Sequence, residues 1–197
     1  MSQMDKAVND GASRHNISNS VLSTNRSIRI FGKIDEACEQ RVAEALERFN
    51  KESSRKKISL FINSRGGFYD SGINIVETIQ SSTAPVHGVV IQSACSSAFY
   101  VLQACKKRIA YSNKAVLMCH APDLADVRVD QTDRDAVIKK TEKAHRKFLR
   151  LVAKRSDGKI SFKKMSTLSR NEGDISAYRA RRLGLLDLVY RNKIKNK

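Results

Sequence analysis

A regular alternation between two kinds of hydrophobic pattern constrains the fold of this chain more than any other feature. Short segments rich in apolar and β-branched residues alternate with longer ones in which apolar residues recur every three or four positions, as on one face of a helix. The short segments are residues 26–32, 56–63, 84–92 and 114–120, and the helical ones are residues 35–49, 73–80 and 96–105. Strands that alternate with helices favour parallel crossover connections, so the sequence predicts an α/β fold.

The length of 197 residues favours one main domain. We expect a flexible polar leader at residues 1–25, a folded domain at residues 26–190 and a basic tail at residues 191–197. Within the domain, residues 131–155 are predicted to form one long helix with a narrow apolar stripe and highly charged remaining faces. A helix of this kind is often only half covered by its own domain, so we expect it to pack against another subunit. The stripe comprises Val137, Thr141, Ala144, Phe148, Leu151 and Val152.

The charge of the chain is unusually positive, with a formal net charge of +17 from 37 basic and 20 acidic side chains. Such a field would attract nucleic acid or an acidic partner. No zinc finger or RNA-binding aromatic motif accompanies it, so we interpret it as a solvated basic surface and do not expect nucleic acid as a partner. A basic protein that binds nucleic acid stays an open alternative.

The sequence has no feature of a membrane or exported protein. Its apolar runs are shorter than a membrane span, and its first residues lack the apolar core of a secretory signal. The four cysteines, at positions 38, 95, 105 and 119, form no CxxC pair and have no zinc-binding spacing. We therefore expect a cytoplasmic protein with reduced thiols, no metal and no membrane partner.

Two loops at predicted strand ends contain the residue types that catalysis uses, and chemistry in α/β sheets gathers at such ends. One loop contains the adjacent glycines Gly66 and Gly67, which let backbone amides approach a ligand closely. The other, Gln92–Ser96, leads into a helix, where a serine would lie near free amides that stabilise the oxyanion of acyl transfer. His120 ends a separate strand and could serve as the general base for that serine.

Four segments carry a resemblance to a known family. They are INSRGG (62–67), APVHGVVIQSACSSAFY (84–100), KRIAYSNKAVLMCHAP (107–122) and ISAYRARRLGLLD (175–187). In order and spacing they resemble the Clp peptidases, the serine endopeptidases of ATP-dependent Clp proteases, and the resemblance covers residues 26–189.

The resemblance implies an architecture and a set of partners. The family fold is a crotonase-like α/β spiral of repeated β-β-α units with a protruding helical handle, which the predicted helix at residues 131–155 matches. Family members stack two seven-membered rings into a tetradecamer, which encloses a chamber where peptides and unfolded proteins are cut. An AAA+ unfoldase feeds the chamber and uses the ATP, so this chain is expected to bind no nucleotide or other cofactor.

The resemblance also implies the site residues. Ser96 takes the place of the nucleophile and His120 that of the base. The amides of Gly66, Gly67 and Ser97 would form the oxyanion hole. Counting back from the segment at residues 175–187 places Glu172 at the third triad position, usually aspartate. Asp174 is the alternative.

Several alternatives stay open at this stage. A register shifted by one residue would make Cys95 the nucleophile, whereas Ser97 would be rotated by about 100° around the helix. Arg65 replaces the proline that is usual before the glycine pair, and Gln92 replaces a glycine near the nucleophile, where its side chain could crowd substrate. The chain could therefore also be a catalytically weak subunit with a structural role in a mixed ring.

Overall fold

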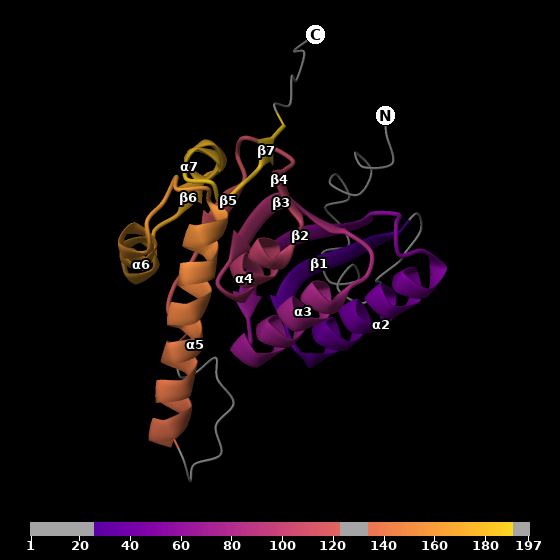
Figure 1. The fold of residues 1–197 in the computed structure, drawn as a ribbon, viewed down its shortest axis with the longest axis horizontal. Helices are drawn as coiled ribbons and strands as arrows, with labels where there is room; N and C mark the ends of the chain where they lie inside the picture. The colour runs from indigo at the N-terminus through magenta and orange to yellow at the C-terminus, as the bar shows by residue number, and fades with distance from the viewer. Residues whose placement is uncertain (1–25, 123–133, 191–197) are drawn as a thin grey trace.

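The computed structural model describes residues 26–122 and 134–190, so the expected leader and basic tail lie outside the described residues (Figure 1). The strands are β1 (Ser27–Ile34), β2 (Ile58–Gly67), β3 (Val86–Cys95), β4 (Lys107–Ala110), β5 (Val116–Met118), β6 (Ile175–Ser176) and β7 (Leu188–Val189). The helices are α2 (Glu36–Glu52), α3 (Tyr69–Ser81), α4 (Ser97–Ala104), α5 (Arg134–Arg155), α6 (Phe162–Asn171) and α7 (Ala177–Arg182).

The sheet has one branch point, at β3. The order β1-β2-β3-β4-β7 is parallel throughout, as the alternation of strands and helices predicts. β4 pairs with the first half of β3, at His87–Val90, whereas β5 pairs in parallel with its last residues, Ser93–Cys95. β6 then adds antiparallel to β5. The fork brings the end of β5 beside the end of β3.

Helices α2, α3 and α4 lie side by side against the sheet (Figure 1). α2 begins where the Asp35 carboxylate accepts a hydrogen bond from the Cys38 amide, at 2.8 Å. Its buried face consists of Cys38, Val42, Ala45, Leu46 and Phe49, which confirms the helical spacing predicted for residues 35–49. Burying that stripe against β1 and α3 holds the helix in place.

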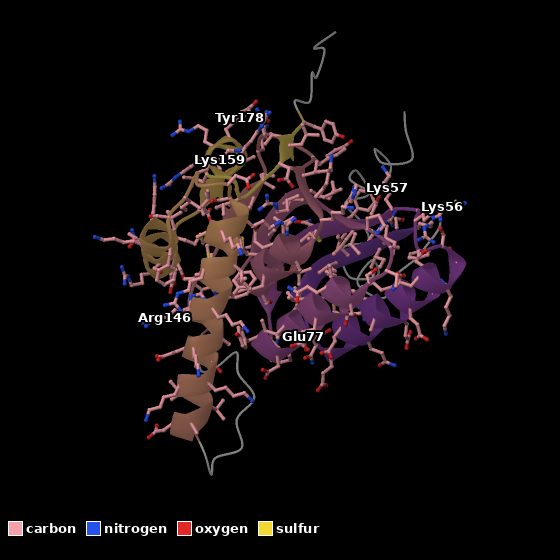
Figure 2. All side chains as sticks on the ribbon, in the orientation of Figure 1. Lys56, Lys57, Glu77, Arg146, Lys159 and Tyr178 are labelled. Atoms are coloured by element: carbon pink, nitrogen blue, oxygen red, sulfur yellow. The ribbon has the colours of Figure 1, made fainter. Side chains whose placement is uncertain are left out.

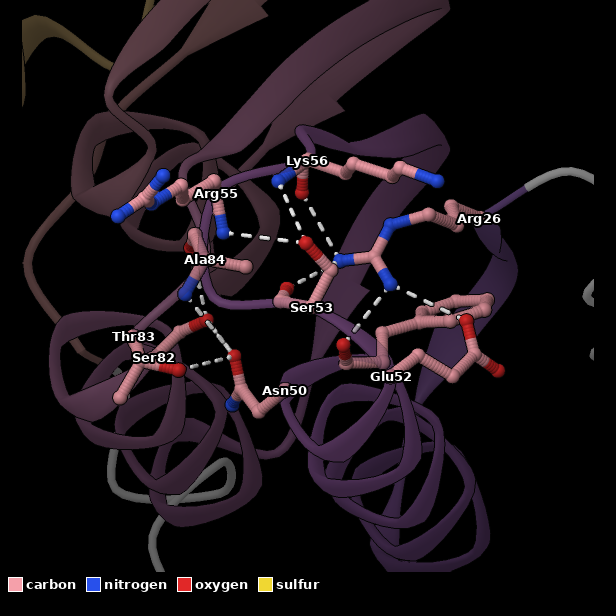
Figure 3. Close-up of polar contacts among 10 residues, drawn as sticks. Arg26, Asn50, Glu52, Ser53, Arg55, Lys56, Ser82, Thr83 and Ala84 are labelled. Atoms are coloured by element: carbon pink, nitrogen blue, oxygen red, sulfur yellow. Dashed lines mark hydrogen bonds and ion pairs between the residues drawn. The ribbon is translucent and has the colours of Figure 1, made fainter.

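Two polar side chains fix the end of α2 (Figure 3). The guanidinium of Arg26 donates to the main-chain carbonyls of Phe49 and Ser53, at 2.8 and 2.9 Å, and satisfies oxygens that the helix end leaves free. The Asn50 side-chain oxygen accepts from the amide of Ala84, at 3.0 Å, and from the hydroxyl of Ser82, at 2.9 Å. α2 is thereby joined to the connection that leads into β3.

The long helix predicted for residues 131–155 is α5, and its first three predicted residues lie outside the described part of the chain. Figure 1 shows α5 running past α4, with its N-terminal end projecting from the body as a handle does. The buried stripe differs from the predicted one. His145, Leu149 and Val152 are buried, whereas Ala144 and Leu151 are exposed. Phe148, which belongs to the predicted stripe, is half-buried and packs with a tilted ring against Tyr100 of α4, 4.3 Å between centroids.

Sequence patterns missed β4, α6 and the two short strands β6 and β7. In β4, Arg108 occupies a buried position, 4% exposed, which a hydrophobic pattern assigns to an apolar residue. α6 has a recognisable start, because the Ser161 hydroxyl accepts from the Lys164 amide, at 3.2 Å. The spacing of Phe162, Met165 and Leu168 after that cap was the signal that would have revealed it.

The positive charge is spread over separate parts of the surface. Lys56 and Lys57 extend into solvent at one end of the molecule, and Arg146 and Lys159 at the other (Figure 2). Over residues 26–122 and 134–190, no helix is both long and apolar enough to cross a bilayer.

An ion pair between the buried Arg108 and the partly exposed Asp187 joins β4 to the turn before β7. The Arg108 guanidinium donates to both carboxylate oxygens of Asp187, at 2.6 and 3.2 Å, and the Arg108 amide adds a third hydrogen bond, at 2.7 Å. Partial burial by itself would raise the pKa of Asp187. The hydrogen bonds and charge of Arg108, together with the charge of Arg155, outweigh it and hold that pKa below the ordinary value.

Replacing Asp187 with Asn should lower the free energy of unfolding at pH 7 by about 2 kcal/mol. The Arg108 charge would stay buried without its partner, while the partial exposure of Asp187 moderates the loss. Because the folded-state pKa is depressed, the carboxylate stabilises the fold above its ordinary pKa of 3.8 and this contribution is lost as the pH falls through the lower value. Urea titrations at fixed protein concentration should show that the free energies of unfolding of the wild type and of Asp187→Asn converge at acid pH. Glu47→Gln, which removes an exposed pair with Lys51, should change nothing; equal effects of the two variants would contradict the assignment.

Candidate functional site

Ser96 lies in a strained turn between β3 and α4. Its φ of 52° and ψ of −125° are in a region that non-glycine residues rarely adopt. The Ser96 amide donates to the Met118 carbonyl, at 2.9 Å, and the next residue already begins a buried helix. The turn is therefore held on both sides by packed elements, and such over-determined strain is common at functional sites.

His120 reaches Ser96 from the neighbouring strand. The distance between His120 Nε2 and Ser96 Oγ is 2.7 Å, although the two residues are 24 positions apart. The register that pairs Cys95 with Met118 places the residue two positions after β5 next to the residue one position after β3. In the tautomer whose Nε2 accepts from the hydroxyl, the pair has the geometry of a nucleophile and its general base.

The other small nucleophiles near Ser96 are differently placed. Cys95 is fully buried, and burial raises the pKa of its thiol although the nearby Arg65 opposes the shift. A protonated, inaccessible thiol is a poor nucleophile. The Ser97 hydroxyl is buried and donates to the Gly67 carbonyl, at 3.4 Å, whereas Ser93 donates to Asn63 Oδ1, at 3.3 Å. Of these four residues, Ser96 is the one whose hydroxyl faces a histidine.

The glycine pair forms the wall of the turn. Gly66 has a φ of +105°. A Cβ added to it would lie 2.6 Å from the Ser96 Cβ and 2.8 Å from the Cys95 carbonyl oxygen. A Cβ on Gly67 would lie 2.2 Å from the Ile34 carbonyl oxygen of β1. The two glycines let β2 approach both neighbouring strand ends at main-chain contact. The Gly66 amide itself donates to the Ser64 hydroxyl, at 3.0 Å.

The two candidate acids are not joined to His120. Glu172 is the exposed C-cap of α6, with a left-handed φ of 49°. Asp174 lies 4.0 Å from the guanidinium of Arg65, and both side chains are largely exposed. Among the residues that the structure describes, no carboxylate forms a hydrogen bond with the His120 ring. The structure thus brings Ser96, His120 and the glycine pair together and leaves the acids apart.

The two departures from the family pattern have polar partners other than Ser96 and His120. Arg65, in the place of a proline, contacts Asp174 and the Cys95 sulfur, the latter at 3.7 Å. Gln92 is exposed, and its side-chain oxygen accepts from Asn63 Nδ2, at 3.4 Å.

Sequence reasoning missed a buried polar cluster behind the turn. The Tyr100 hydroxyl makes a short hydrogen bond with His145 Nδ1, and His145 Nε2 lies 2.9 Å from the Ser169 hydroxyl. Burial, together with the charge of the nearby His120, lowers the pKa of His145 to about 4, so the imidazole is neutral at neutral pH. A histidine inside the apolar stripe of a charged helix was the available signal. No group of three potential metal ligands occurs in the described ranges.

Comparison with solved structures identifies the fold. ClpP1 from Listeria monocytogenes matches with a TM-score of 0.72 and 21% sequence identity, covering 85% of this chain and 92% of that one. A mutant of the same ClpP1 gives a TM-score of 0.71 and 22% identity, with the same coverage. The likeness confirms the predicted crotonase-like α/β fold. A family model described as Clp protease matches residues 10–193, and on that match this chain belongs to the Clp protease family.

Proposed function

We propose that the chain is a serine endopeptidase subunit of a Clp-type protease. The observation that supports this most is the 2.7 Å contact between Ser96 Oγ and His120 Nε2 at a strained strand-to-helix turn. A hydrogen-bonded hydroxyl and imidazole of this geometry suit acyl transfer to the serine. Membership of the Clp protease family supports a peptide bond as the substrate of that reaction.

The proposed reaction needs no cofactor. Ser96 Oγ attacks the carbonyl carbon of the peptide bond while its proton moves to His120 Nε2. The C–N bond then breaks as His120 passes that proton to the leaving amine, and water hydrolyses the acyl-enzyme by the same route. We assign the oxyanion of the intermediate to the amides of Gly67 and Ser97, because the Gly66 amide already donates to Ser64.

The third member of the triad is proposed to be Glu172, with Asp174 as the alternative. Glu172 is exposed and unpaired among the described residues, whereas Asp174 has Arg65 as its ionic partner. A carboxylate free of other partners is the better candidate to orient an imidazole. A catalytically weak subunit is the alternative function, and the separation of both acids from His120 is the observation in its favour.

The proposed assembly is a tetradecamer of two stacked seven-membered rings that enclose the sites. α5 would mediate the stacking, and Leu151 near the C-terminal end of that helix, 51% exposed, would supply an apolar contact. The substrates would be unfolded polypeptides delivered by an AAA+ unfoldase in the cytoplasm.

Ser96→Ala should lower kcat/KM for a fluorogenic peptide by at least about a thousandfold, because the nucleophile is removed. Ser93→Ala, Ser97→Ala and Cys95→Ala are the matched controls and should retain most of the activity. A fluorophosphonate probe should label the wild-type chain at Ser96 only. A dead Cys95→Ala beside an active Ser96→Ala, with inactivation of the wild type by iodoacetamide, would identify a cysteine peptidase. A wild type that neither hydrolyses peptide nor takes the probe would favour the inactive subunit.

Gly66→Ala should abolish peptide hydrolysis, because the new methyl group would collide with Ser96 and the Cys95 carbonyl. Gly32→Ala is its control, since Gly32 has a similar positive φ of +86° but open space around the Cβ position. Both variants carry the backbone strain of about 1 kcal/mol. Only the first should lose activity in an assay at matched folded concentration; equal activity would show that the glycine pair does not shape the site.

Leu151→Glu should break the stacked assembly into smaller particles, because stacking would bury a charge at an apolar contact. The side chain is exposed in the single chain, so each protomer should still fold. Sedimentation velocity measures the change, and Leu188→Glu on β7 is the control that should keep the wild-type size. Wild-type protein that sediments as a 22.1 kDa monomer at micromolar concentration would contradict the proposed assembly.

A further inference from the structure

One short helix carries both the candidate nucleophile and a buried tyrosine. Ser96 is the N-cap of α4, and Tyr100 lies four residues later, about one turn further along the helix. The Tyr100 side chain is only 2% exposed, and its ring is held by the edge of Tyr69, 5.8 Å away between centroids, and by Phe148. Its hydroxyl is 3.3 Å from the main-chain carbonyl oxygen of His120. α4 therefore contacts His120 at two points, the ring through Ser96 and the main chain through Tyr100.

The second partner of that hydroxyl comes from the handle. His145 on α5 contacts the Tyr100 hydroxyl through Nδ1 and the Ser169 hydroxyl of α6 through Nε2. Burial raises the pKa of the thiol of Cys119, the residue before His120, and the neighbouring Ser169 hydroxyl opposes this shift. A closed set of buried polar contacts thus runs from α4 through α5 and α6 back to the chain beside His120.

If Tyr100 donates to the His120 carbonyl, the donor and the acceptor of every hydrogen bond in this cluster follow. Tyrosine has one hydroxyl proton, and a neutral imidazole has one N–H. With the Tyr100 proton on the carbonyl, the Nδ1–H of His145 donates to the Tyr100 oxygen and its Nε2 accepts from Ser169. The Tyr100 hydroxyl, both ring nitrogens of His145 and the Ser169 hydroxyl then all have partners with His145 neutral.

We propose that Tyr100 is a positioning residue for His120 and that His145 anchors its hydroxyl. The proposal rests on the proposed peptidase function of the same site. Within the described ranges the His120 ring contacts Ser96, and the His120 main-chain carbonyl accepts from Tyr100. The hold on the main chain therefore acts together with the proposed triad acid in placing the imidazole relative to Ser96. Both contacts to His120 come from α4 and its N-cap residue. The packing of this one helix therefore positions the Ser96 hydroxyl and the Tyr100 hydroxyl together.

Tyr100→Phe tests the proposal, because it removes the hydroxyl and keeps the ring. It should lower kcat about five- to tenfold with KM unchanged, the effect of one lost positioning hydrogen bond. Tyr69→Phe is the matched control, a buried neighbouring tyrosine whose hydroxyl does not contact His120, and it should keep wild-type kcat. His145→Leu should match Tyr100→Phe, His145→Asn should restore most of kcat through its side-chain amide, and the double variant Tyr100→Phe/His145→Leu should lose no more than either single one.

An NMR readout separates this proposal from the proposed function. The ring Cε1–H signal of His120, assigned by its absence in His120→Ala, should move on Tyr100→Phe and stay in place on Tyr69→Phe. An unmoved signal, or additive losses in the double variant, would overturn the positioning role even in an active enzyme. If Tyr100→Phe moves the His120 signal but the wild-type protein hydrolyses no peptide, the positioning role is supported and the peptidase proposal is overturned.

Discussion

The pairing of β5 with the last residues of β3 is the constraint on which the rest of the site depends. β4 occupies the first half of the same strand edge, so β3 must leave β4 and accept β5 within a few residues. The register that sets Met118 against Cys95 also supplies the carbonyl that holds the Ser96 amide. A shift by one residue would turn alternate side chains to the opposite face and separate His120 from Ser96.

Backbone sterics then determine what surrounds the serine. Ser96 can hold a positive φ because β3 and α4 are both packed, and β2 can approach it because Gly66 has no Cβ. Gly72 on α3 has the same property, since a Cβ there would lie 2.6 Å from the Ser97 Cβ. The turn around Ser96 is thus built from close main-chain contacts, which leave no room for a side chain at Gly66 or Gly72.

The handle helix contributes to the body of the domain as well as projecting from it. Its buried face carries His145, a polar residue that burial keeps neutral, between Tyr100 and Ser169. A fully satisfied polar cluster inside an apolar contact favours one arrangement of the three helices over slipped ones, because slippage would leave buried groups unpaired. Arg155, at the other end of α5, similarly caps the carbonyls of Gln103, Cys105 and Lys106.

The sequence by itself determined the alternation of strands and helices, the buried face of α2 and the small set of residues around Ser96, because these depend on local periodicity and on residue types. It left Ser96, Cys95 and Ser97 as rivals, and it missed β4, whose buried Arg108 becomes tolerable through Asp187, 79 residues away. Burial of Cys95, the direction of the Ser97 hydroxyl and the partner of Asp174 were decided by tertiary structure. The physical reason is that side-chain burial, hydrogen-bond partners and ion pairs arise between segments distant in sequence, and no local pattern encodes which segments meet.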